Sequence, residues 1–132
     1  MTTVVDASLV VAFLVDDGPD GAWAAEALGG GSLAAPHLLP VEVAGMLRRA
    51  ALTGAIPDTV ATLAHADLLD IPMILYPYEP LAHRIWSLRA NVTGYDAWYV
   101  ALAEALDAPL ATLDLRLAGA AGPECSFVTP ER

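Results

Sequence analysis

Short runs of β-branched and apolar residues alternate along this chain with longer stretches of helical periodicity. Such alternation favours a parallel sheet covered by helices, because parallel neighbours need a long crossover and a helix usually supplies it. We expect strands at 3–5, 33–35, 73–76, 110–112 and 126–128. A chain of 132 residues is long enough for one domain with one core and too short for two. The sequence therefore predicts a single α/β domain.

The segments between the strands predict about seven helices, whose limits are set by turn residues. A turn at Asp17-Gly18-Pro19 stops the first helix, and Pro40 suits the first position of the third, where a missing N–H costs nothing. Gly54 ends that third helix. The helices are expected at 7–15, 21–28, 40–53, 58–69, 80–90, 95–106 and 115–118.

The charge of the chain is strongly negative, with a formal net charge of −10 and no lysine. Six arginines carry all the fixed positive charge. Proteins that bind nucleic acid are usually basic, because neutralising phosphates dominates their affinity. Taken alone, the charge argues against a nucleic-acid partner. That argument weakens if several acids form one cation site, since a bound metal ion cancels their charge locally.

Other bulk features point to the cytoplasm. No apolar run approaches the roughly 18 residues of a membrane span. The N-terminus has neither the basic region nor the cleavage site of a signal peptide. The one cysteine, Cys125, excludes an internal disulfide and fits a reducing compartment. We therefore expect a cytoplasmic protein without membrane contact.

Four acidic residues share one predicted position in the fold. Asp6 follows the first strand, and Asp114 follows the strand at 110–112. Glu42 and Asp96 each fall in the predicted first turn of a helix. In a parallel sheet, strand carboxyl ends and the starts of the following helices lie at one edge, where ligands bind. The four acids are therefore expected to meet there.

Each acid also has a purely structural explanation. Asp6 could cap a helix, and Glu42 could answer the dipole of its helix. Thr93 and Asp96 fit a capping box, and Asp114 suits a turn or a cap. For any one of these acids alone, the structural interpretation is the more favoured.

Taken together, the four acids favour a cation site. Two like charges 4 Å apart repel by about 4 kcal/mol at an effective dielectric near 20. A cluster of carboxylates persists by binding cations or by keeping protons. Oxygen ligands without cysteine or histidine match Mg²⁺ or Mn²⁺ better than Zn²⁺. Such ions serve phosphoryl chemistry, because they activate a water molecule and stabilise the charge of an in-line transition state.

Four segments of the chain resemble the successive motifs of the PIN domain family, and more narrowly those of the VapC toxins of bacterial toxin–antitoxin pairs. The resemblance covers essentially the whole chain, 1–132, and its most specific segment is the third. The segments are Val5-Asp6-Ala7-Ser8, Pro40-Val41-Glu42-Val43-Ala44, Tyr95-Asp96-Ala97-Trp98-Tyr99-Val100-Ala101-Leu102-Ala103 and Thr112-Leu113-Asp114.

The resemblance implies a fold and a site. It implies a five-stranded parallel sheet in the order 3-2-1-4-5. Its Mg²⁺ or Mn²⁺ site would be formed by Asp6, Glu42, Asp96 and Asp114, and Ser8 and Thr112 match the hydroxyl residues that brace these acids. Many relatives carry asparagine three residues after the helix acid, where this chain has Gly45, so one secondary contact differs.

The resemblance also implies an activity and partners. The reaction would be hydrolysis of an RNA phosphodiester by metal-activated water, as in the toxin of a type II toxin–antitoxin system. The partners would be the RNA substrate, a cognate VapB-type antitoxin and a second copy of the chain in a homodimer.

Several further residues have two open interpretations. Arg48, Arg49 and Arg116 could hold RNA phosphates, or they could simply be solvated surface side chains. Arg84 and Arg89 are expected to be surface residues only. Tyr95 and Trp98 flank Asp96 and could stack on an unpaired base, although core packing is favoured.

Four other functions are compatible with an α/β layout of this kind. A PIN fold that binds a partner without cutting is the main rival, and the intact acids argue against it. A receiver-like phospho-acceptor would need an acid pair and a lysine, and a related phosphatase would need a second acid at Ser8. A nucleotide-binding loop would follow a strand, whereas Gly29-Gly30-Gly31 follows a predicted helix.

Overall fold

A computed structural model describes residues 1–131 as a five-stranded sheet in which all neighbouring strands are parallel. The order is β3-β2-β1-β4-β5, which confirms the expected topology. The register places Val4 of β1 opposite both Ala34 of β2 and Leu110 of β4. The strands are β1 (Thr2–Val5), β2 (Ser32–Pro36), β3 (Ile74–Tyr76), β4 (Leu110–Ala111) and β5 (Phe127–Val128).

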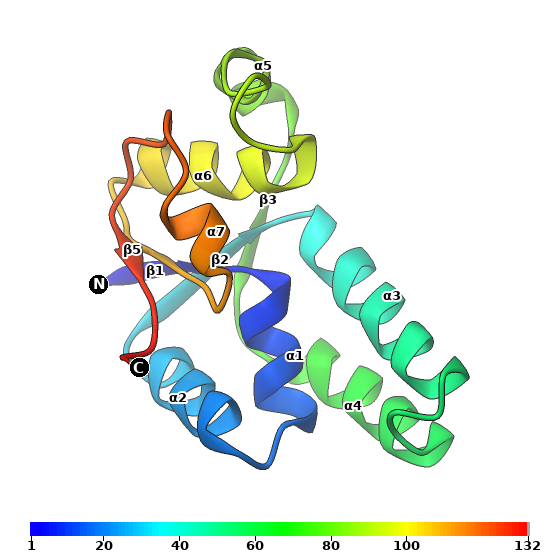
Figure 1. The fold of residues 1–132 in the computed structure, drawn as a ribbon. Coiled ribbons are helices and arrows are strands. Elements are labelled where there is room, and N and C mark those ends of the chain that lie inside the picture. Colours follow the sequence, from blue (N-terminus) through cyan, green and yellow to red (C-terminus); the bar gives the residue numbers. More distant parts are fainter. Residues whose placement is uncertain (132) are drawn as a thin grey trace.

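Seven α-helices and one 3₁₀ turn surround the sheet in the described part of the chain. Helices α1 to α4 cover one face, and α5 and α6 lie on the other, so the molecule has three layers (Figure 1). No described helix is both long and apolar enough to cross a membrane. The helices are α1 (Ala7–Val15), α2 (Pro19–Leu28), α3 (Leu38–Leu52), α4 (Asp58–Asp70), η1 (Glu79–Leu81), α5 (Ala82–Ser87), α6 (Gly94–Leu106) and α7 (Leu115–Ala118).

The topology creates one reversal point beside β1. The chain moves outward from β1 through β2 to β3, then crosses back over the other face to β4. Val4 and Val5 of β1 are fully buried, and α6 packs across β1, β2 and β4. The carboxyl ends of β1 and β4 are thus the place where an α/β sheet of this kind binds ligands.

Three helices differ from the predictions by two residues or more. Helix α2 begins at Pro19 instead of Gly21, because a proline at the first position starts a helix well. Gly21 then lies inside the helix, where an added Cβ would stand 1.8 Å from the backbone oxygen of Asp16. The predicted helix at 80–90 is split into η1 and α5 and ends at Ser87.

The third difference concerns the site. Helix α3 begins at Leu38, so Pro40 is its third residue and still has no intrahelical donor to lose. Glu42 therefore lies just beyond the first turn, which contains no acid. The interpretation of Glu42 as an acid that interacts favourably with the dipole at the helix start is thus wrong, because this charge–dipole stabilisation falls off within the first turn.

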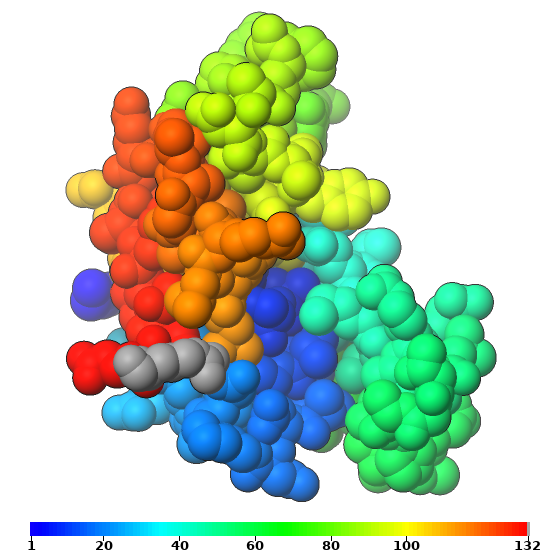
Figure 2. Space-filling view, in the orientation of Figure 1, coloured from blue at the N-terminus to red at the C-terminus, as the bar shows by residue number. Residues whose placement is uncertain are grey.

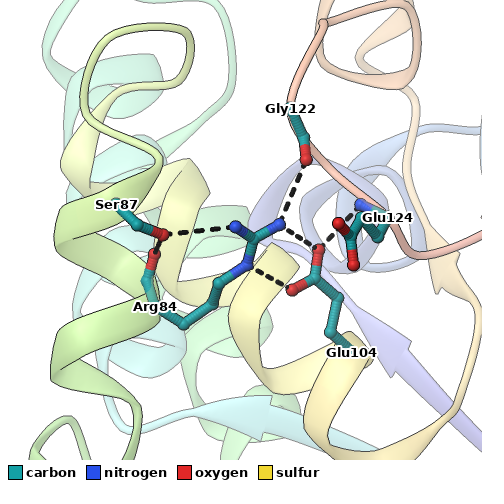
Figure 3. A network of polar contacts seen from close by, with 5 residues as sticks. All are labelled: Arg84, Ser87, Glu104, Gly122 and Glu124. Carbon is teal, nitrogen blue, oxygen red and sulfur yellow. Dashed lines mark hydrogen bonds and ion pairs between the residues drawn. The ribbon is translucent and has the colours of Figure 1, made fainter.

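Arg84 joins α5 and α6 to the loop before β5 (Figure 3). Its Nε and Nη2 atoms donate to the two carboxylate oxygens of Glu104, at 2.6 and 2.9 Å. Nη2 also donates to the carbonyl oxygen of Gly122, and the backbone N–H of Glu124 donates to Glu104. The expectation that Arg84 only solvates its helix is therefore wrong, because a bidentate ion pair holds it.

Candidate active site

Four acidic side chains from distant segments gather at the carboxyl edge of the sheet. Asp6 follows β1, Asp114 follows β4, Glu42 lies on α3, and Asp96 lies in the first turn of α6. Figure 2 shows the start of α1 (dark blue) on one face of the molecule, between α7 (orange), α3 (cyan) and the start of α6 (yellow-green). We call these four residues the acidic cluster.

Asp6 is the buried centre of the cluster. Its Oδ1 accepts hydrogen bonds from the Ser8 hydroxyl at 2.7 Å and from the Leu9 backbone N–H at 3.1 Å. Its Oδ2 accepts a hydrogen bond from the Thr112 hydroxyl. The hydroxyl of Thr112 also accepts from the Asp114 backbone N–H at 2.9 Å. Ser8 and Thr112 thus brace Asp6, as the resemblance implies.

Glu42 is held from across the site by Tyr99. The phenolic hydroxyl of Tyr99 donates to Oε1 of Glu42 at 2.7 Å and so joins α6 to α3. Tyr99 is fully buried, whereas Glu42 is only partly buried. The sequence pattern alone does not indicate a role for Tyr99. The available signal was its place in the specific third motif, three residues after Asp96.

Asp96 and Asp114 occupy the starts of two helices. The hydroxyl of Thr93 accepts a hydrogen bond from the Asp96 backbone N–H at 3.5 Å, as a capping residue does. Oδ1 of Asp114 accepts from the backbone N–H groups of Arg116 and Leu117 at the start of α7. Asp6 likewise caps α1. The structural and the functional interpretations are compatible for Asp114, because its Oδ2 accepts no hydrogen bond from the described residues.

The charges of neighbouring carboxylates raise one another's pKa values. Burial raises the pKa of Asp6, against the hydrogen bonds from Thr112 and Ser8 that lower it, and the charge of Asp96 raises it further. Burial also raises the pKa of Glu42, the hydrogen bond from Tyr99 lowers it, and the charges of Asp96 and Asp6 add to the increase.

Asp96 connects the remaining members of the cluster. Burial raises its pKa, the hydrogen bond with Thr93 lowers it, and the charge of Asp114 raises it again. The guanidinium of Arg116 partly opposes this repulsion. Each of the four acids is therefore close enough to at least one other for their charges to interact.

The donor set has the chemistry that a hard divalent cation requires. All four side chains offer carboxylate oxygens, which suit Mg²⁺ and Mn²⁺, and mutual repulsion favours an added positive charge. Within residues 1–131, however, no three acidic, histidine or cysteine side chains already form a metal-holding group. Both oxygens of Asp6 accept hydrogen bonds, and one oxygen of Glu42 is occupied by Tyr99. The residues fit the ion by type, and binding it would require some of these side chains to turn.

The arginines named from the sequence are separated by the fold. Arg116 lies close enough to Asp96 to lower its pKa. On α3, Arg49 is seven residues after Glu42 and so lies on the same helix face, two turns away. Arg48 instead lines the groove between α3 and α4, together with Asp58 and His65. The structure therefore places Arg116 beside the site, Arg49 two turns further along the face of α3 that carries Glu42, and Arg48 in the α3–α4 groove.

The two aromatic residues beside Asp96 also differ in their surroundings. Trp98 meets Tyr78 edge to face, with ring centroids 5.3 Å apart. Its indole nitrogen is buried and has no hydrogen-bond partner within the described residues. Core packing is thus the correct interpretation for Trp98. Tyr95 is 62% exposed, so packing does not explain it.

This sheet order, with acids at the reversal point, defines a class of protein. The chain belongs to the PIN domain family, whose profile matches residues 3–123. The comparison confirms the resemblance carried by the four sequence segments.

The chain is also similar to curated ribonucleases that carry the name VapC. The chain is 45% identical over 128 residues to ribonuclease VapC1 of Mycobacterium tuberculosis, with 94% of each chain covered. It is 38% identical over 129 residues to ribonuclease VapC9 of the same species, with 98% of each covered. The fold matches that of VapBC2 from Rickettsia felis, solved with a DNA fragment from its promoter, at a TM-score of 0.74 and 11% identity. That match covers 99% of this chain and 100% of the other and shows the fold alone.

Proposed function

We propose that this protein is an endoribonuclease that uses Mg²⁺ or Mn²⁺ to hydrolyse RNA phosphodiester bonds. The observation that carries the proposal is the acidic cluster, in which Asp6, Glu42 and Asp96 all have raised pKa values from burial and mutual repulsion. Identity of 38–45% to VapC ribonucleases across nearly the whole chain supports it. The main alternative is a PIN-fold protein that binds partners without cleavage.

In the proposed mechanism, some residues of the chain would hold the cation and others would orient the carboxylates that bind it. Asp6, Glu42, Asp96 and Asp114 would hold the cation, which supplies an activated water and stabilises charge on the phosphate. Ser8 and Thr112 fix the carboxylate of Asp6 by hydrogen bonds to both oxygens. That preorganisation matters because a small displacement of a reacting group costs a large factor in rate.

Two further side chains would act on the substrate and on Glu42. Tyr99 fixes one oxygen of Glu42 and leaves the other without a described partner. Arg116 is exposed beside Asp96 and would contact a phosphate of the RNA. Its guanidinium also offsets part of the negative charge that would otherwise repel the RNA.

A cleavage assay with a matched variant tests the activity. Labelled structured RNA is incubated with the purified chain and Mn²⁺ or Mg²⁺, then with a chelator. We expect cleavage that stops with the chelator and falls by at least about a hundredfold in Asp96→Asn, since that variant removes one charged ligand. Equal cleavage by wild type and Asp96→Asn would point to a contaminant or to another site. Binding of RNA without any cleavage would favour the non-cutting alternative.

We further propose that the chain is the toxin of a toxin–antitoxin pair and binds a VapB-type antitoxin. An apolar groove of about 490 Å³ lies between α1, α2 and the end of α4, lined among others by Phe13, Leu28, Leu33 and Ile71. A segment of the antitoxin would occupy it, because buried apolar area drives such contacts. Phe13→Asp should abolish co-purification with the co-expressed antitoxin and leave the melting temperature nearly unchanged, since Phe13 is 41% exposed.

The assembly and the compartment complete the proposal. Val41 and Leu52 of α3 and Leu63 of α4 are each more than two-thirds exposed and offer an apolar surface on which a homodimer would form. Light scattering of the isolated chain tests this, and a monomer at micromolar concentration would contradict it. The free thiol of Cys125 is compatible with the reducing cytoplasm in which we expect the protein to act.

A further inference from the structure

Tyr95 is an exposed aromatic ring at the rim of the acidic cluster. It lies in the first turn of α6, directly before Asp96, and 62% of it is exposed. Tyr99 follows one helical turn later, so the two tyrosines share a helix face. The hydroxyl of Tyr99 donates a hydrogen bond to Glu42 on α3, so this face of α6 is directed toward the acidic cluster. Tyr95 is therefore the outer, solvent-exposed end of that face.

The other exposed or half-exposed aromatics near this end of the molecule already have neighbours. The ring of Trp98 meets Tyr78 edge to face. The guanidinium of Arg89 covers one face of the Trp86 ring, at 4.5 Å from its centroid. Within residues 1–131, the ring of Tyr95 has neither a ring contact nor a cation over it. Its aromatic face is open to a ligand.

The charge of the protein makes such a ring important for holding RNA. The chain carries a net charge of −10, and Arg116 is the arginine whose charge is felt at Asp96. Phosphate attraction is therefore weak beside the cluster. Stacking of a base on an aromatic ring needs no positive charge and strengthens binding by roughly five- to 150-fold for each base.

We propose that Tyr95 positions the substrate by stacking on an unpaired base next to the phosphodiester bond that is cleaved. Bases within an RNA duplex are covered by their neighbours, whereas bases in loops and ends are free to stack on a side chain. The proposal rests on the proposed ribonuclease function and adds to it a residue that selects unpaired RNA.

Steady-state kinetics on a set of matched RNAs tests the proposal. One hairpin RNA carries the mapped cleavage site in its loop. Two further RNAs are identical except that one lacks the base before that site and the other lacks the base after it. We expect Tyr95→Ala to raise KM by roughly five- to 150-fold with kcat within about threefold, because binding is lost more than chemistry. Tyr95→Phe keeps the ring and should behave as wild type. Trp86→Ala, another exposed aromatic, is the matched control and should leave KM unchanged.

The increases in KM caused by removing the base and by removing the Tyr95 ring should not be additive in free energy. If Tyr95 stacks on that base, Tyr95→Ala loses nothing further on the RNA that lacks it. Losses that multiply, or a wild-type KM for Tyr95→Ala, would overturn the proposal. Circular dichroism of each variant separates these results from misfolding.

Failure of the nuclease assignment is distinguishable from failure of stacking. If wild type cleaves no RNA, binding of a single-stranded RNA that contains the fluorescent base 2-aminopurine is measured instead. Quenching by wild type and Tyr95→Phe but not by Tyr95→Ala would support stacking without catalysis. Equal quenching by all three proteins, or none by any of them, would overturn it.

Discussion

At the scale of single residues, the structure gives Tyr99 a role that the sequence pattern did not indicate, which is to hold Glu42 by a hydrogen bond. Its hydroxyl donates to Glu42 and lowers the pKa of that carboxyl, against a larger increase from burial. In Tyr99→Phe the donor is lost, so the pKa of Glu42 should rise further. We expect the acid limb of the pH–activity profile to move to higher pH and stability to fall by about 1 kcal/mol.

The control for this prediction is a tyrosine outside the site. Tyr78→Phe keeps the ring that meets Trp98 and has no contact with Glu42, so its pH profile should match that of wild type. An unshifted acid limb in Tyr99→Phe would mean that Glu42 does not titrate in the active range.

The acidic cluster should make the metal-free protein less stable as pH rises. Asp6, Glu42 and Asp96 have pKa values raised above their ordinary values of 3.8, 4.5 and 3.8. Groups with raised folded-state pKa values favour folding below their unfolded pKa, and this advantage is lost as pH rises through the folded pKa. With chelator, the melting temperature should therefore fall between about pH 4 and neutrality by this contribution. Mn²⁺ should reduce that fall, whereas an identical pH profile with and without Mn²⁺ would contradict a cation site here.

Removing one charge should relieve the same repulsion. At neutral pH and without metal, Asp96→Asn should raise the melting temperature by about 2–5 °C, which corresponds to about 0.5–1 kcal/mol for a half-buried charge. Added Mn²⁺ should stabilise wild type more than this variant. Differential scanning calorimetry measures both quantities, and a lower melting temperature for metal-free Asp96→Asn would contradict the mutual repulsion.

At the scale of elements, α3 carries a helix-weakening residue on the face of Glu42. Gly45 lies three residues after Glu42, and a Cβ added there would meet no atom within 4 Å. Gly45→Ala should therefore stabilise the protein by about 0.5–1 kcal/mol, because glycine is disfavoured inside a helix. Urea unfolding measures this. A matched change at Gly21, where the Cβ would stand 1.8 Å from a backbone oxygen, should destabilise the protein instead.

The Arg84–Glu104 pair should fix the loop before β5 to α5 and α6. Burial raises the pKa of Glu104, but the hydrogen bonds from Arg84 and from the Glu124 N–H, with the charge of Arg84, lower it overall. Its stabilising contribution is thus present above the ordinary pKa of 4.5 and lost as pH falls below it. Arg84→Met should cost about 1–2 kcal/mol, after allowance for the partial exposure of Arg84.

Hydrogen exchange locates this effect. Amides at 119–125 should exchange faster in Arg84→Met than in wild type. Arg89→Met is the matched control, because within residues 1–131 Arg89 donates a hydrogen bond to the backbone oxygen of Trp86, in its own segment, and its guanidinium lies over the ring of Trp86. Equal exchange at 119–125 in both variants would show that the ion pair does not hold the loop.

At the scale of the whole molecule, the small number of positively charged side chains limits the electrostatic contribution to RNA affinity. Arg84 is bound to Glu104 and Arg89 covers Trp86, which leaves at most four of the six arginines for phosphates. For single-stranded RNA the slope of log Kobs against log[salt] should therefore be no steeper than about −3. Arg49→Ala should make it shallower by about 0.7, whereas Arg48→Ala, in the α3–α4 groove, should not change it.

Much of the fold was predictable because its signals are local. The five strands and most helix limits followed from alternating apolar runs and from turn residues such as Gly54. The resemblance to the PIN family supplied the strand order, which the structure confirms. The split of the helix predicted at 80–90 was missed, because the break depends on how this segment packs against α6.

By itself, the sequence determined that acids follow the first and fourth strands and start or nearly start two helices, since a parallel sheet brings those places to one edge. Only the tertiary structure decided which groups touch there. Thr112 bonds Asp6 across 106 residues, and Tyr99 bonds Glu42 across 57. Periodicity specifies the buried face of each helix, but the contacts between faces depend on the angle and depth at which α3 and α6 pack on the sheet. Those quantities arise from the fit of the whole core, which no local pattern contains.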